Sequence, residues 1–296
     1  MAPNQGYDYR ERAGTDARHE PLLDYLSRRF RHSTKAQWRV RIEAGDVRVE
    51  EAPATAAQVL RPGQQVSWRR AGWVEPEAPR TFAIFTEDDD VLAVDKPAGL
   101  PTLPGAGFFE ATLYHQVRQQ APDAVPLHRL GRWTSGVVLF AKSRAARAEL
   151  SRQWRCREVE KRYRALASGD PAWDAITIDT PIGPVPHDTL GTVHAAVDSG
   201  RPSASHATVI RRNGWAFVCD VAIDTGRPHQ IRIHLAAAGH PLAGDPLYAA
   251  GGLPIPGTTA LPGDPGYTLH AVALAFRHPR TGAPVTVASP PPDGLR

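Results

Sequence analysis

The chain has 296 residues, with 35 lysines and arginines against 31 acidic residues, a formal net charge of +4 and a pI near 9.3. This length predicts one large domain, or one with a small addition, and the basic balance suits a polyanionic partner without requiring one. No apolar run approaches the ~20 residues of a membrane-spanning helix, and the first twenty residues are unlike a secretory signal. Cys156 and Cys219 are too few for a disulfide framework. We expect a monomeric cytoplasmic protein with reduced thiols and no membrane contact.

The amino-terminal quarter predicts a leader and a small module. We expect residues 1–19, which are polar and mixed in charge, to be a disordered leader. Apolar residues at helical spacing from Leu22 to Phe30 predict a helix, and Ser33 or Thr34 can cap a second one that ends at Gly45. Alternation at 47–49 and 66–68, around a Pro62-Gly63 turn, predicts short strands. Residues 20–75 therefore form a compact unit of two helices and short strands.

A run of basic residues lies in this unit. From Tyr25 to Ile42 there is no acidic residue, while the cations are Arg28, Arg29, Arg31, Lys35, Arg39 and Arg41. Such a run is often only a solvated helix face. The alternative is that these side chains contact the phosphates of a nucleic acid.

The rest of the chain predicts an α+β domain over residues 80–296. The segment 75–80 is proline-spaced and acidic, as in a linker. Beyond it, short β-branched runs alternate irregularly with helical patterns at 111–120 and 143–154, unlike the regular alternation of a parallel α/β sheet. Residues 251–266 are too rich in glycine and proline for regular structure, and we expect a surface insertion there.

The most informative segment is the loop His128-Arg129-Leu130-Gly131-Arg132-Trp133-Thr134-Ser135-Gly136, which runs into an apolar strand at 137–142. It resembles the H-R-L-D-x-x-T-S-G signature of the RluA-type RNA pseudouridine synthases. Four further segments match that family in order: residues 91–100 resemble its strand and K-P-x-G, 161–166 its K-x-Y-x-A, 224–235 its T-G-R-x-H-Q-I-R-x-H, and 244–248 its G-D-x-x-Y.

The resemblance implies a fold and a reaction. The expected catalytic domain is a mixed, largely antiparallel sheet with helices around a cleft, preceded by a unit similar to the S-four-like RNA-binding module. The implied activity is the isomerisation of uridine to pseudouridine in ribosomal or transfer RNA, with no cofactor and no metal. A flipped base also needs cations for its phosphates and an apolar or aromatic wall.

Site residues follow from the same resemblance. Tyr163 is expected to pack on the target uracil and Arg129 to hold its phosphate. Arg232 is expected to pair with the catalytic aspartate, and His128 and Thr134 to shape the loop and to bind the RNA. For the amino-terminal module, the resemblance implies that the basic run binds RNA.

The catalytic position itself is occupied by Gly131, which has neither a nucleophile nor a proton acceptor. Arg232 is then expected to lack its partner, a costly arrangement for a buried cation unless a water, an anion or another acid replaces the carboxylate. Asp123, Asp224 and Asp245 are the candidates for such an acid.

Two other functions remain open. The chain could be an inactive synthase homologue that binds RNA without modifying it. A metal-dependent hydrolase would need His229, His234 and His240 with Asp245 as ligands, but the histidine spacings do not place two ligands on one helical turn. Ser135 lacks the surroundings of a hydrolase nucleophile.

Overall fold

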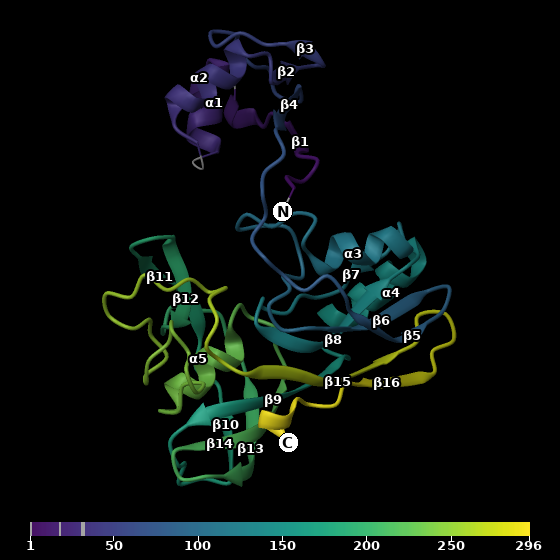
Figure 1. Ribbon diagram of the computed structural model, residues 1–296, viewed down its shortest axis with the longest axis vertical. Coiled ribbons are helices and arrows are strands. Elements are labelled where there is room, and N and C mark those ends of the chain that lie inside the picture. The colour runs from purple at the N-terminus through teal and green to yellow at the C-terminus, as the bar shows by residue number, and fades with distance from the viewer. Residues whose placement is uncertain (1, 18, 31–32) are drawn as a thin grey trace. The chain divides into compact units, whose positions relative to one another are not determined.

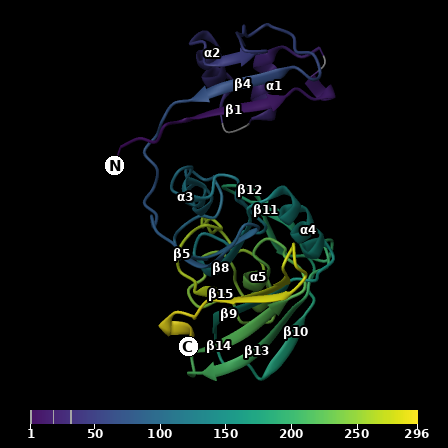
Figure 2. The same ribbon diagram turned by 90° about the vertical axis from the view of Figure 1, so that its right-hand side faces the viewer.

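The computed structural model describes residues 2–17, 19–30 and 33–296, so Arg31 of the basic run lies outside the described residues. Backbone contacts divide the chain into two units, Met1–Glu75 and Pro76–Arg296, which Figures 1 and 2 show from two sides. Each unit has a hydrophobic core of its own. The boundary falls at the start of the acidic, proline-spaced segment.

The first unit packs two helices on a four-stranded sheet. The helices are α1 (Leu22–Arg29) and α2 (Lys35–Glu43). The sheet order is β1-β4-β2-β3, with β1 at Tyr7–Arg12, β2 at Val47–Val49, β3 at Ala52–Pro53 and β4 at Gln65–Arg70. Thr34 caps α2, since its hydroxyl accepts from the Gln37 amide and the Gln37 side chain accepts from the Thr34 amide.

The disordered leader predicted for residues 1–19 is wrong over the strand β1 and the short 3₁₀ turn η1 (Thr15–Ala17). Strand β1 pairs antiparallel with the whole of β4, from Tyr7 opposite Arg70 to Arg12 opposite Gln65. The Tyr9 ring stacks on Trp68, and Ala17 is fully buried. Strong polarity concealed this strand because an edge strand needs only one face in contact with a core.

The second unit is built on one large sheet. Its order is β10-β13-β14-β9-β15-β8-β6-β5, with β16 added to β15 and β7 added to β8. The strands are β5 (Ala83–Glu87), β6 (Val91–Lys96), β7 (Val125–Pro126), β8 (Thr134–Ala141), β9 (Glu160–Ser168), β10 (Ala175–Ile178), β13 (Ser205–Arg212), β14 (Ala216–Ile223), β15 (Leu269–Arg277) and β16 (Pro284–Ala288). Only the β15–β8 pairing is parallel among those described. The predicted α+β class with a largely antiparallel sheet is confirmed.

Helices and a hairpin surround this sheet (Figure 1). The helices are α3 (Leu113–Gln120), α4 (Arg144–Arg155) and α5 (Gln230–Ala237), and the short turn η2 (Asp293–Leu295) lies near the carboxyl end. Strands β11 (Ile182–His187) and β12 (Gly191–Ala196) form a separate hairpin. Among the described residues, no helix has the length and apolar character needed to cross a membrane.

The centre of the sheet brings distant motifs together. Strand β15 lies between β8 and β9, so that Leu269 is opposite both Thr134 of the signature loop and Ala165 of β9. Residues 251–266 form no helix or strand, as predicted. They are nevertheless more than a surface insertion, because the Gly263 carbonyl accepts a hydrogen bond of 2.9 Å from the Trp133 indole.

Candidate active site

The signature loop is held by the K-P-A-G turn that follows β6. The buried Lys96 ammonium donates to the carbonyls of Pro97, Leu100 and Arg132 at 2.7–3.0 Å. Three carbonyl acceptors match the three donors of a protonated lysine. Burial lowers the pKa of Lys96 to about 7. The backbone of the loop is therefore fixed beneath the residues that surround Gly131.

A second clamp fixes the loop that leads into α5. The Gln230 side-chain carbonyl accepts from the Thr225 hydroxyl and the Arg227 amide, while its amide donates to the carbonyl of Ala204 and the hydroxyl of Ser205. His229 then starts the helix in the left-handed region, at φ 55°. Such a conformation is costly for histidine and persists only where its surroundings hold it.

Arg232 lies on α5 with 2% of its surface exposed, and it is not the unpaired cation that the sequence predicted. Its Nε and Nη2 donate to the two carboxylate oxygens of Asp245 at 2.7 and 2.8 Å, and its Nη1 donates to the Pro262 carbonyl at 2.9 Å. Burial opposes the charged form, but the bonds to Asp245 outweigh it and raise the pKa of Arg232. Of the three acids that the sequence offered as a replacement, Asp245 is the one that supplies the carboxylate.

Asp245 is saturated by this arrangement. Besides Arg232, its Oδ1 accepts from the amides of Leu247 and Tyr248. Its side chain is fully buried, and it does not line the cavity at Gly131. Asp245 therefore replaces the carboxylate as the partner of Arg232, and no oxygen of it faces that cavity.

The cavity at Gly131 has a volume of about 130 Å³. It brings together residues from separate motifs: Arg129, Gly131 and Thr134 of the signature loop, Tyr163 of β9, and Arg227, His229 and Arg232 around the start of α5. The three residues that the sequence predicted as catalytic thus line one cavity: Gly131, Tyr163 and Arg232. Asp123 and Asp224 do not line it.

Tyr163 and Arg129 differ in their surroundings. Tyr163 is 8% exposed, and burial raises the pKa of its phenol to about 12. Arg129 is exposed and makes no hydrogen bond or ion pair with the described residues. An aromatic wall and a free cation on one hollow are the groups that a flipped nucleotide needs.

His128 and Thr134 are tied to the protein. The Nε2 atom of His128 accepts from the Leu139 amide at 3.1 Å, and its ring stacks on Trp154. Burial lowers the pKa of His128 to about 4, which keeps the ring neutral. Thr134 is buried, and its amide donates to the Gly131 carbonyl. Both positions suit the shaping of the loop better than a direct contact with RNA.

Tyr267 is a cavity residue that the sequence did not reveal. It follows the irregular segment 251–266, is 6% exposed, and lies with its ring 4.2 Å from the guanidinium carbon of Arg232. A side chain on Gly131 would place its Cβ 3.1 Å from the Tyr267 hydroxyl. No motif marks this residue, and only the path of the chain brings it to the cavity.

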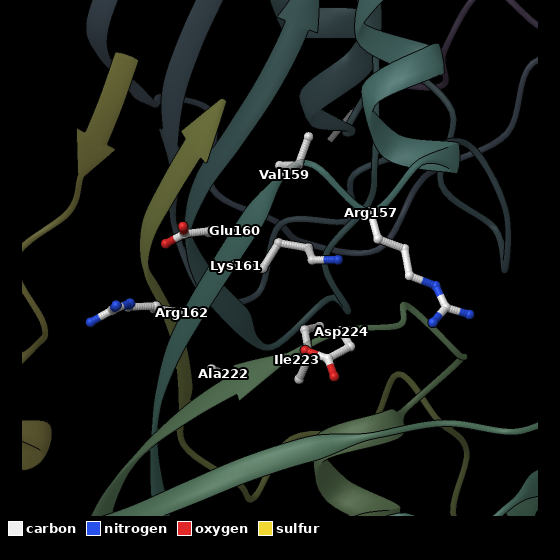
Figure 3. A pocket seen from close by; sticks show the side chains of 8 residues that line it. All are labelled: Arg157, Val159, Glu160, Lys161, Arg162, Ala222, Ile223 and Asp224. Carbon is white, nitrogen blue, oxygen red and sulfur yellow. The ribbon is translucent and has the colours of Figure 1, made fainter. Parts of the chain in front are cut away.

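A second hollow of about 310 Å³ adjoins the first through Ile223, which lines both. Figure 3 shows Lys161 of β9 reaching toward the space between Arg157 and Asp224. Lys161 and Tyr163 are two residues apart on one strand and so point to the same face. Neither Lys161 nor Arg157 forms an ion pair with the described residues, and burial lowers the pKa of Lys161.

Three of the five described cations of the basic run form ion pairs. Arg28 contacts Asp16 and Glu20 at 3.2 and 2.7 Å, Arg29 contacts Glu11 at 3.1 Å, and Lys35 contacts Asp24. The Arg41 guanidinium lies over the Trp38 ring at 4.9 Å. Arg39 is exposed and forms no ion pair with the described residues.

Comparisons with known proteins point to one family. Residues 90–237 match the family model described as RNA pseudouridylate synthase. The chain is 41% identical over 93% of its length to a Synechocystis protein named an uncharacterized RNA pseudouridine synthase, of which it covers 95%. It is 34% identical to RNA pseudouridine synthase 5 of Oryza sativa, with coverages of 93% and 84%, and 36% identical to the Nitrosomonas europaea ribosomal large subunit pseudouridine synthase D, with coverages of 86% and 76%.

A solved structure shares the fold. The human RNA pseudouridylate synthase domain containing 1 superposes with a TM-score of 0.59 at 26% identity, over 75% of this chain and 89% of that one.

Proposed function

The chain belongs to the RNA pseudouridine synthase family, and we propose that it isomerises uridine in ribosomal or transfer RNA through an active site without the usual carboxylate at position 131. The observation that carries this proposal is the cavity at Gly131, where Arg129, Tyr163 and Arg232 converge from three separate motifs. A protein that only bound RNA would not need an aromatic wall facing a buried cation.

The reaction breaks the bond between ribose C1′ and uracil N1, turns the base and joins C5 to C1′. It is redox-neutral, so the proposal requires no cofactor. Tyr163 would receive the uracil ring, and Arg129 would hold the phosphate of the extruded nucleotide. A ribosomal RNA substrate is supported by the name of the Nitrosomonas relative, whereas transfer RNA rests on the sequence resemblance alone.

The second candidate function is RNA binding without modification. The observation that favours it is that no carboxylate lines the cavity at Gly131 among the described residues. Both candidates predict RNA binding, and only the first predicts a new carbon–carbon glycosidic bond.

Tritium release separates the two candidates. The purified protein is incubated with ribosomal and transfer RNA transcripts that contain [5-³H]uridine, because C5 loses its hydrogen when it joins C1′. Release of tritium, together with pseudouridine found by mass spectrometry of the same RNA, supports the synthase. Binding of these RNAs without release from any of them would support the inactive homologue.

A further inference from the structure

The Tyr267 hydroxyl occupies the space into which a side chain at position 131 would extend. An ideal Cβ on Gly131 would lie 3.1 Å from this oxygen and 3.4 Å from the Thr134 hydroxyl. Gly131 is not in the left-handed region, so its backbone does not explain the absence of a side chain. The glycine leaves room, and the Tyr267 hydroxyl lies in it.

The ring of Tyr267 is fixed there by its neighbours. One face lies against Arg232, whose guanidinium carbon is 4.2 Å from the ring centre, and the residue is 6% exposed. A cation over an aromatic face is attracted to the ring. The Asp245 carboxylate offsets part of that attraction, but it also fixes the guanidinium in place.

Two other groups of the cavity could in principle exchange a proton. His229 Nδ1 is bonded at 2.7 Å to the Tyr248 hydroxyl, and burial lowers the pKa of His229 to about 3. The Tyr163 phenol has its pKa raised to about 12 by burial. The Tyr267 hydroxyl, like that of Tyr163, has no hydrogen-bond partner among the described residues and lines the cavity, but it is the Tyr267 oxygen that lies beside position 131.

We infer that Tyr267 takes over the role of the missing carboxylate as a general acid and base, an inference that rests on the proposed synthase function. When the C1′–N1 bond breaks, the phenol gives its proton to N1 and becomes a phenolate beside Arg232. After C5 has bonded to C1′, the phenolate takes the proton from C5. The enzyme ends in its starting state, and the product carries a proton on N1 and none on the linked carbon.

Removal of the hydroxyl alone tests this step. Tyr267→Phe keeps the ring on Arg232, so we expect RNA affinity within about twofold of the wild type. The single-turnover rate of tritium release from [5-³H]uridine RNA should fall at least ~100-fold, the scale of one general acid–base group. Tyr114→Phe is the control, since it removes a hydroxyl on α3 whose one hydrogen bond with the described residues is from Arg118 and which does not line the cavity.

A rescue distinguishes catalysis from support of the fold. In the Gly131→Asp, Tyr267→Phe double variant, loss of the hydroxyl makes room for the new side chain. We expect this double variant to release tritium at least tenfold faster than Tyr267→Phe alone. The Gly131→Ala, Tyr267→Phe double variant fills the same space without a carboxylate, and it should be no faster than Tyr267→Phe.

The outcomes separate this inference from the proposed function. An active wild type with an equally active Tyr267→Phe variant overturns the inference and leaves the synthase function standing. A lost rate that Gly131→Asp does not restore also overturns it, because the hydroxyl would then not stand in for a carboxylate. A wild type inactive on every RNA tested overturns both.

Discussion

The basic run of the first unit and the cations at the hollows of the second unit lie in different electrostatic surroundings. In the first unit Arg28, Arg29 and Lys35 contact acids from segments that precede the run, whereas in the second unit Arg129 and Lys161 form no ion pair with the described residues. Three cations of the run, which look uncompensated in the sequence, are ion-paired, whereas Arg129 and Lys161 are available at the two hollows. A charge run predicts a binding surface only when the fold leaves it without partners.

The largest expected effect concerns the buried pair of the second unit. Asp245→Ala leaves the Arg232 cation buried without a partner, and we expect a loss of about 3–5 kcal/mol in the free energy of unfolding. Hydrogen exchange of the β9 and β15 amides under native conditions measures this loss in the second unit. Asp16→Ala, which removes an exposed partner of Arg28, is the matched control and should leave the unfolding of the first unit unchanged. Equal effects of the two changes would contradict the contrast between the units.

Tyr163→Ala should remove the wall for the uracil ring. We expect a loss of stacking of about 1–3 kcal/mol in the bound nucleotide and no detectable pseudouridine. The overall RNA affinity should change little, since phosphate contacts dominate it. Mass spectrometry of the treated RNA and a binding titration measure the two effects. An unaltered pseudouridine yield would place Tyr163 in the core alone.

Acid should destabilise the second unit through two neutral histidines. Burial lowers the pKa of His128 to about 4 and of His229 to about 3, below the value near 6.5 of an unfolded histidine. Below pH 6.5 the unfolded state binds more protons, so stability is full above pH 6.5 and falls as the pH drops toward 4. From pH 7 to pH 5 we expect a loss of about 1–2 kcal/mol for each histidine. Urea titrations at several pH values measure the free energy of unfolding. His229→Gln should make this free energy depend less steeply on pH, and an unchanged dependence would show that His229 is charged in the folded protein.

The smallest expected effect is on the salt dependence of RNA binding. Arg129→Ala and Lys161→Ala should each lower the slope of log affinity against log salt by about 0.7–0.9, the value of one phosphate contact. Arg28→Ala and Arg29→Ala should lower this slope less. In the wild type both arginines are paired with acids, so they contact phosphates less readily. A titration over several salt concentrations compares the four variants. A larger change from the paired arginines would reverse the comparison and return the binding surface to the basic run.

Much of the fold could be predicted from local signals. Of the two residues predicted as the cap of α2, Ser33 and Thr34, the structure uses Thr34. The helices expected at 111–120 and 143–154 appear as α3 and α4. These signals are readable because caps and apolar spacing act within a few residues. The strand β1 was missed, since its pairing with β4 joins residues more than fifty positions apart. Edge strands of polar composition carry little local signal.

The candidate site divides in the same way. The motifs determined which loops form it, and the sequence alone showed that position 131 has no carboxylate. Only the tertiary structure decided that Asp245 neutralises Arg232 and that Tyr267 reaches the space beside Gly131. Motif residues are recognisable because their spacing is local, whereas ion pairs and cavity walls depend on which distant segments the sheet brings side by side. The motif residues are determined by their positions in the chain, whereas the ion pair and the cavity walls are determined by the pairing of β8, β15 and β9.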